Sequence, residues 1–178
     1  MIEPKIPRNM TSGTVKRQRG PMMTLLVGRH VNKIDKKGRV SVPKPFRDTF
    51  AREDFNGVYV YPSIRFNAIE ACGGTYFREL AHRLNDSLEM FSPEQDDLLI
   101  AILDNAHALP FDPEGRVVIP AELLEMAGVT AEARFVGRAD YFQIWDPMSH
   151  DEHRHHGLSQ ARARAVTLPA QRGPGGEV

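Results

Sequence analysis

Lysine and arginine are concentrated in one short stretch of this 178-residue sequence. Residues 29–52 hold eight of them against two acidic residues, whereas the whole chain has 23 basic and 23 acidic residues and a formal net charge of zero. Cationic side chains gathered on one surface neutralise phosphates and release the counterions of a nucleic acid. The sequence therefore predicts an anion-binding surface in this stretch, and nucleic acid is the first candidate ligand.

Residue patterns typical of enzymes are absent from the sequence. It has no glycine-rich phosphate loop and no Gly-x-Ser-x-Gly motif, and its single cysteine, Cys72, excludes an intramolecular disulfide and a multi-cysteine zinc site. We predict no catalytic residues, no cofactor, no metal site and no small-molecule substrate. A histidine-rich segment near the C-terminus contains His150, His153, His155 and His156. Two interpretations of it stay open, a charged tail or an opportunistic metal-binding cluster.

The basic stretch belongs to a repeat at an offset of 77 residues. Residues 30–43 align without a gap with residues 107–120, and a histidine, an aspartate, a glycine, an arginine, a valine and a proline coincide. Asp35 and Gly38 occupy the first and fourth positions of a β-turn, as Asp112 and Gly115 do in the second copy. Each copy therefore predicts a β-hairpin, called here the first hairpin (residues 29–43) and the second hairpin (residues 106–120).

The second copy is an internal control, because structural residues are needed in both copies whereas DNA contacts are needed only where DNA is touched. Seven basic residues become non-basic in the second copy: Arg29, Lys33, Lys36, Lys37, Lys44, Arg47 and Arg52 align with Ala106, Pro110, Pro113, Glu114, Ala121, Leu124 and Val129. A two-stranded ribbon is thin enough for the major groove. We therefore predict that the first hairpin binds double-stranded DNA through Arg29, Asn32, Lys33, Lys36, Lys37, Arg39 and Ser41.

The second hairpin is predicted to serve assembly, because Val118 replaces Ser41 and makes its exterior more apolar. One basic residue of the first copy, Arg39, keeps a basic counterpart, Arg116, in this acidic unit. Arg39 is therefore either a DNA contact or the partner of Asp35 in an ion pair that orients the hairpin. The predicted structural motif comprises Asp35, Gly38, Asp112, Gly115 and Arg116.

The repeat divides the chain into two small domains with flanking segments. We expect a flexible basic arm over residues 1–23, a first unit over 28–73, a helical connector over 74–104, a second unit over 105–148 and a disordered tail over 149–178. The connector predicts helices at about 75–89 and 93–104, the latter capped by Ser92 with Pro93 at its first position. No apolar run approaches the length of a membrane span and no secretory signal is evident, so we expect a cytoplasmic protein.

The tandem hairpins resemble those of the MraZ family over about residues 24–147. The motifs that carry this resemblance are Asp35 to Pro43, Asp112 to Pro120, Phe46-Arg47, Gly128, Phe135 to Arg138 and Ile144-Trp145. Shorter AbrB-like antitoxins share a single hairpin, so the tandem arrangement with a helical connector is the specific signal. The first unit departs from the pattern because it ends in Ile69-Glu70-Ala71-Cys72 and lacks the expected tryptophan.

The resemblance implies an α+β fold of two tandem AbrB-like swapped-hairpin β-barrel units joined by helices. It also implies a cytoplasmic, nucleoid-associated transcriptional regulator of the division and cell-wall gene cluster, its own promoter included. Such a protein binds short direct DNA repeats as a homo-oligomer, in the form of a ring, and needs neither a membrane nor a cofactor. The alternative is an AbrB-like antitoxin or a protein-binding adaptor.

Overall fold

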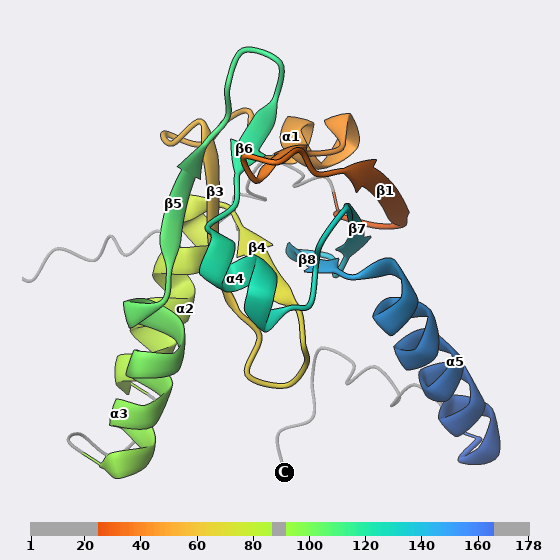
Figure 1. Cartoon of the computed structure of the whole chain (residues 1–178). Helices are drawn as coiled ribbons and strands as arrows, with labels where there is room; N and C mark the ends of the chain where they lie inside the picture. Colours follow the sequence, from red (N-terminus) through yellow and green to blue (C-terminus); the bar gives the residue numbers. More distant parts are fainter. Residues whose placement is uncertain (1–24, 87–91, 166–178) are drawn as a thin grey trace, which may run out of the picture.

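The computed structural model describes residues 25–86 and 92–165 (Figure 1). The first unit contains β1 (Arg29–Lys33), β2 (Arg39–Ser41), α1 (Lys44–Phe50), β3 (Gly57–Pro62) and β4 (Ile69–Cys72). The connector contains α2 (Gly74–Asp86) and α3 (Pro93–Leu99), which continues as the π-helical turn η1 (Ile100–Asp104). The second unit contains β5 (His107–Pro110), β6 (Arg116–Val118), α4 (Ala121–Met126), β7 (Glu132–Gly137) and β8 (Tyr141–Trp145), and α5 (Pro147–Ala163) follows it.

The strands of the two units are interleaved in space. Six of them form one sheet in the order β1-β7-β8-β4-β3-β5, and β2 pairs with β6 in a second, two-stranded sheet. Every strand pair among the described residues is antiparallel. Four of the six pairs, β1 with β7, β2 with β6, β3 with β5 and β4 with β8, join a strand of the first unit to one of the second. The mixed α and β composition with a mainly antiparallel sheet agrees with the predicted class.

The two units share one hydrophobic core. Val40, Val42 and Phe46 of the first unit and Val117, Ile119 and Leu123 of the second belong to a single buried cluster. The prediction of two small domains did not anticipate this sharing. Its physical reason is the length of β2 and β6, because a strand of three residues is too short to cover an apolar cluster by itself. Because the units are interleaved, the side chains of each unit help to bury the apolar residues of the other.

The described part of the connector contains both predicted helices, although residues 87–89 of the helix expected at 75–89 lie outside the described residues. The Ser92 hydroxyl accepts a hydrogen bond from the Gln95 amide at 3.1 Å, which confirms the expected N-cap of α3. The helix α2 packs on the sheet through Phe77, whose ring stacks on Tyr59 with centroids 4.7 Å apart. Figure 1 shows α2 and α3 together on one side of the molecule. No helix in the described part of the chain has the length and apolar character needed to span a bilayer.

The predicted disordered tail is wrong for residues 149–163, which form most of helix α5. Asp146 caps this helix by accepting hydrogen bonds from the amides of Met148 and Ser149, and Pro147 occupies its first turn. The sequence Asp146-Pro147, an N-cap residue followed by proline, was the signal from which the start of this helix could have been predicted. Residues 166–178 of the predicted tail and the predicted arm at 1–23 lie outside the described residues.

Histidines provide the face by which α5 packs on the sheet. His150 is almost fully buried, and the ring of His153 lies 5.0 Å from Trp145 and 4.6 Å from Phe66 between ring centroids. Arg134 donates to Nδ1 of His150 at 3.3 Å and also pairs with Asp151. Because a guanidinium can only donate, Nδ1 of His150 must be an unprotonated acceptor. The packing therefore requires a neutral His150.

We predict that the packing of α5 weakens as the pH falls from 6.5 toward 4. Burial, followed by the nearby charge of Arg134, lowers the pKa of His150 to about 4, and burial also lowers the pKa of His153. A lowered histidine pKa means that the unpacked state binds more protons in this window, so the stabilisation is complete above pH 6.5 and is lost on acidification. Trp145, the only tryptophan, reports this change as a shift of its fluorescence to longer wavelength.

The control for this experiment is His155→Gln, which changes an exposed histidine of the same helix and should keep the shift. Far-UV circular dichroism separates local release of α5 from global unfolding. A Trp145 emission that stays constant between pH 6.5 and 4 would contradict the role of the neutral histidines.

Candidate nucleic-acid interface

The turn of the first hairpin is held by the side chain of Asp35. Its Oδ1 accepts hydrogen bonds from the backbone amides of Lys37 at 2.9 Å and Arg39 at 3.0 Å, and Gly38 adopts φ = +75°. The hydrogen bond from the Arg39 amide is the main cause that lowers the pKa of Asp35. This is the Asx-type turn that the sequence predicted. It directs Lys36 and Lys37 into solvent at the tip.

The two hairpins fix each other's position through reciprocal hydrogen bonds. The Ile119 amide donates to the Gly38 carbonyl at 3.0 Å, and the Val42 amide donates to the Gly115 carbonyl at 3.1 Å. A Cβ atom on Gly38 would lie 2.7 Å from the Ile119 carbonyl oxygen. Glycine is therefore required at this position by both the positive φ and the close approach of the other hairpin.

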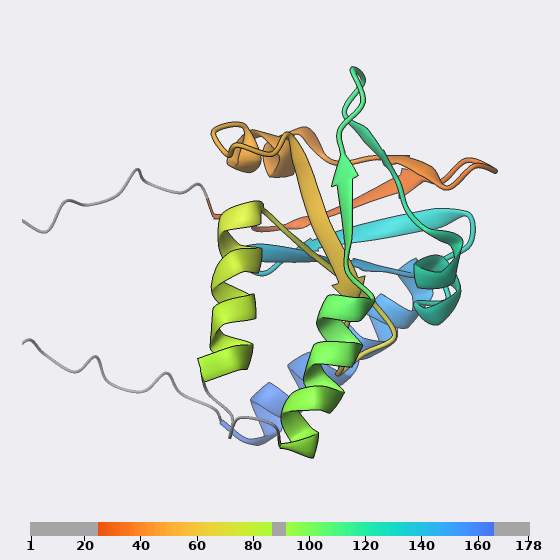
Figure 2. The ribbon, with the colours of Figure 1, turned by 90° about the vertical axis from the view of Figure 1, so that its left-hand side faces the viewer.

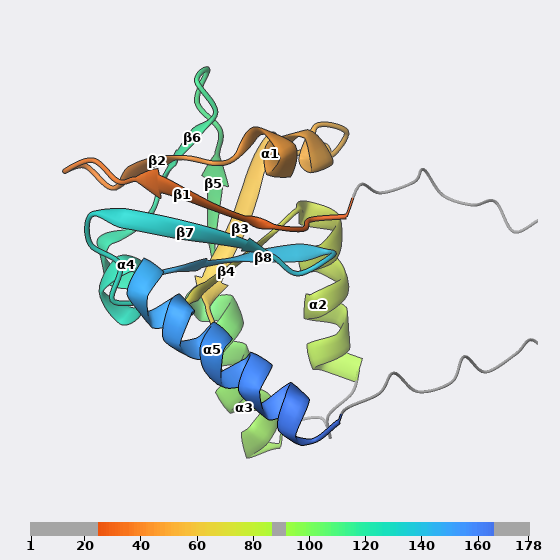
Figure 3. The ribbon, with the colours of Figure 1, turned by 90° about the vertical axis from the view of Figure 1, so that its right-hand side faces the viewer.

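Four cations of the first hairpin are exposed: Arg29, Lys33, Lys36 and Lys37. None of the four has a carboxylate within ion-pair distance in residues 25–86 and 92–165. Figures 2 and 3 show the loop between β1 and β2 extending away from the body of the molecule. The predicted pairing within this hairpin is wrong beyond the turn, because β1 pairs with β7 and β2 with β6, and the two segments meet in one isolated bridge, Ile34 with Val40. The first hairpin therefore presents uncompensated positive charge on a projecting turn.

Two of the predicted DNA-binding side chains also make contacts within the hairpin. Nδ2 of Asn32 donates to the Ser41 carbonyl at 2.6 Å and ties β1 to β2. The side chain of Ser41 itself is exposed. Nε of Arg39 lies 2.6 Å from Oδ2 of Asp35, so the ion pair considered for these residues is present. Asn32 and Arg39 thus have a structural role, whatever they contribute to a ligand.

The second hairpin repeats this ion pair and adds another. Nε of Arg116 lies 2.7 Å from Oδ2 of Asp112, and its Nη2 lies 2.7 Å from Oε2 of Glu114. In the first hairpin the counterpart of Glu114 is Lys37, so Arg39 has no second carboxylate among the described residues. The guanidinium of Arg39 therefore keeps donors available that Arg116 has already used.

Arg47 has a structural role that the sequence did not reveal. Its Nη1 donates to the carbonyls of Val42 at 3.0 Å and Gly115 at 3.2 Å, one in each hairpin. A Cβ atom on Gly115 would collide with that nitrogen, so the guanidinium occupies the space that the glycine leaves. The alignment of Arg47 with Leu124, which packs against the core, was the available signal that this position faces inward.

The second hairpin has a different surface. Its turn carries Pro113 and Glu114 in place of two lysines, and Val118 is 54% exposed where the first hairpin has Ser41. Figure 2 shows the two loops extending in different directions, the first to the right and the second upward. A ligand that contacts the first loop therefore does not contact the second loop at the same time.

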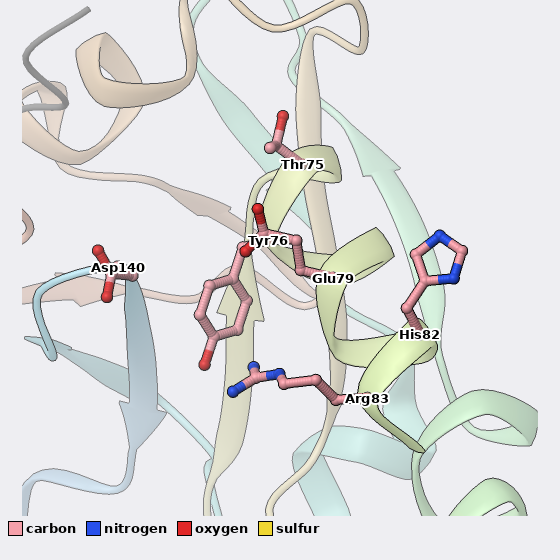
Figure 4. Close-up of a pocket in the computed structure, with 6 residues that line it drawn as sticks. All are labelled: Thr75, Tyr76, Glu79, His82, Arg83 and Asp140. Atoms are coloured by element: carbon pink, nitrogen blue, oxygen red, sulfur yellow. The ribbon is translucent and has the colours of Figure 1, made fainter. Parts of the chain in front are cut away.

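A pocket of about 600 Å³ lies away from both hairpins, between α2 and the β7–β8 turn (Figure 4). The guanidinium of Arg83 lies 5.8 Å from the ring centroid of Tyr76, whereas Asp140 and His82 lie on opposite sides of that tyrosine. These groups do not converge on a common point as catalytic groups must. Within the described ranges, no group of three or more histidine, cysteine, aspartate or glutamate side chains is arranged to hold a metal ion.

The chain is similar to bacterial proteins of one family. Residues 102–167 match the family model described as "MraZ protein, putative antitoxin-like". A protein of Rickettsia akari (strain Hartford) named "Transcriptional regulator MraZ" is 39% identical over 146 residues, which cover 82% of this chain and 97% of the relative. A protein of the same name from Rickettsia bellii (strain OSU 85-389) is 42% identical over 137 residues, which cover 77% of this chain and 91% of the relative.

The relatives extend across both repeat units, because an alignment that covers 82% of this chain must include most of each unit. The aligned length is therefore long enough to include both repeat units and the helical connector. The identity of 39% over 82% of this chain and 97% of the relative shows that the chain belongs to the MraZ family.

Proposed function

We propose that this protein is a DNA-binding transcriptional regulator whose first hairpin contacts double-stranded DNA. The observation that carries the proposal is the contrast between the two turns. Lys36 and Lys37 are exposed and uncompensated, whereas Glu114, at the position of Lys37, is paired with Arg116. The name of the relatives, "Transcriptional regulator MraZ", supports the same function.

The first hairpin suits the major groove in width and charge. The projecting turn is narrow enough to enter that groove, and the exposed lysines at its tip neutralise phosphates on both sides of it. Arg29, Lys33, Lys36 and Lys37 supply the charge, and the available donors of Arg39 together with the Ser41 hydroxyl supply the hydrogen bonds that distinguish bases. The division of these residues between base and phosphate contacts depends on how the turn enters the groove.

The finer details of the proposal rest on the family. We infer that the target is the promoter of the division and cell-wall gene cluster, its own promoter included, with short direct repeats as the binding site. Such a regulator acts in the cytoplasm at the nucleoid. The reciprocal strand pairing between the units supports the tandem AbrB-like swapped-hairpin architecture.

We also propose that the protein acts as a homo-oligomer in the form of a ring. A single hairpin offers few contacts, so useful affinity requires several hairpins on several DNA repeats, each raising the effective concentration of the next. The second hairpin is suited to assembly because its turn is neutralised and Val118 is exposed.

Replacing the two tip lysines should abolish binding. For Lys36→Glu/Lys37→Glu we expect at least about a hundredfold decrease in affinity for the protein's own upstream region, because two attractive interactions with phosphates become repulsive. The salt dependence should also flatten, by about one unit of slope for each phosphate that is no longer neutralised. A mobility-shift titration at several salt concentrations measures both quantities.

The matched control is Glu114→Gln, which changes the equivalent turn of the second hairpin and should leave the affinity nearly intact. An equal decrease in both variants would contradict the proposed division between the hairpins. Equal affinity of the wild type for its upstream region and for random DNA would contradict sequence-specific regulation.

Arg39 and Arg116 provide a second comparison, because they make the same ion pair in the two hairpins. We expect Arg39→Ala and Arg116→Ala to lower the urea midpoint of unfolding to a similar extent. Only Arg39→Ala should also weaken DNA binding, by about tenfold or more, which is the contribution of one good base contact. If DNA affinity were unchanged in Arg39→Ala while stability fell, Arg39 would be a structural residue alone.

A further inference from the structure

Three residues form what is called here the acidic stripe, on the exposed side of the connector. Asp96 belongs to α3, and Ile100 and Asp104 belong to η1. The three residues follow one another at intervals of four, so they lie along one side of the helix. All three are exposed, and Ile100 retains 48% of its accessible surface although it is a large apolar residue. An isoleucine flanked by two carboxylates is therefore presented to solvent.

A basic stripe with the same spacing lies on α5, formed by Arg154, Leu158 and Arg162. All three residues are exposed, and Leu158 retains 43% of its accessible surface. They continue the row of His150 at intervals of four along α5, and, unlike the buried His150, they are exposed. The two stripes have the same four-residue spacing and opposite charge.

The four charged groups of the two stripes have no partner within the described part of the chain. None of them takes part in an ion pair or a side-chain hydrogen bond there. The helix dipole explains why Asp96, in the first turn of α3, and Arg162, in the last turn of α5, are stable without a partner. The helix dipole does not explain Asp104, because a carboxylate at the C-terminal end of a helix is repelled by that dipole.

The stripes cannot pair within one chain, because Figure 1 shows α3 and α5 on opposite sides of the molecule. We propose that the acidic stripe of one copy binds the basic stripe of a second copy. Ile100 then packs on Leu158, and the two carboxylates lie beside the two guanidinium groups. The contact joins two different surfaces, so it is a head-to-tail interface.

A head-to-tail contact repeats from copy to copy and closes into a ring if the rotation between neighbours allows it. The proposal therefore specifies a surface for the homo-oligomer that is separate from the second hairpin, and it rests on the part of the proposed function that makes the protein a homo-oligomer. It places the interface on helices that lie apart from the first hairpin, which leaves the hairpin of every copy open to DNA (Figures 1 and 3).

Charge reversal with complementation tests this interface in the full chain. The acid-reversed variant is Asp96→Arg/Asp104→Arg, and the base-reversed variant is Arg154→Asp/Arg162→Asp. Each variant alone presents like charges on both stripes, so we expect sedimentation to show a fall from the wild-type assembly to the 20.0 kDa single chain. In an equimolar mixture every neighbouring pair of unlike variants regains opposite charges, so the assembly should return.

Two exposed charge reversals outside the stripes, Glu125→Arg on α4 and Arg78→Asp on α2, serve as controls and should leave the mass unchanged. Dissociation of both variants with reassembly in the mixture supports the inference and shows that the variants are folded. Variants that keep the wild-type mass, a mixture that stays dissociated, or a wild type that sediments as a single chain would each overturn it. DNA binding by the wild type is read separately by mobility shift, so failure of this interface and failure of the proposed function give different results.

Discussion

The pairing of β2 with β6 is the interaction on which the rest of the structure depends. Each strand has only three residues, and its hydrogen bonds are completed by the turn glycine of the other hairpin, through Ile119 to Gly38 and Val42 to Gly115. Buried backbone groups must be paired, so neither hairpin can hold its conformation without the other. Arg47 adds donors to both sides of the same contact. The shared core of the two units follows from this mutual dependence.

This dependence separates structural residues from residues available for binding. The aspartate, glycine and arginine of each turn support the crossing of the hairpins, so they recur in both copies. The side chains of Lys36 and Lys37 make no ion pair or hydrogen bond among the described residues, and the second unit has Pro113 and Glu114 in their place. The two hairpins therefore share one turn geometry and differ in surface charge, which is a physical basis for assigning them different partners.

Local chemistry explains which parts of the structure could be predicted from the sequence. The Asp35 turn, the Ser92 cap and the ion pair of Arg39 depend on residues a few positions apart, and the sequence shows them directly. The strand order depends on contacts between units about 77 residues apart, which local patterns do not encode. The helix α5 was missed because its packing face is made of histidines, which read as polar, although His150 is buried beside Trp145. From the sequence, Arg47 was interpreted as a surface cation, although its guanidinium donates hydrogen bonds to carbonyls of both hairpins.

Hydrogen–deuterium exchange with and without the upstream DNA tests the central claim, the division between the hairpins, most directly. Because both hairpins belong to one core, their exchange in the free protein provides a common reference. We predict that DNA slows exchange over the first turn, residues 33–38, and leaves the equivalent second turn, residues 110–115, unchanged, whereas the paired strands β2 and β6 change together. Equal protection of the two segments, or protection confined to the second, would contradict this division.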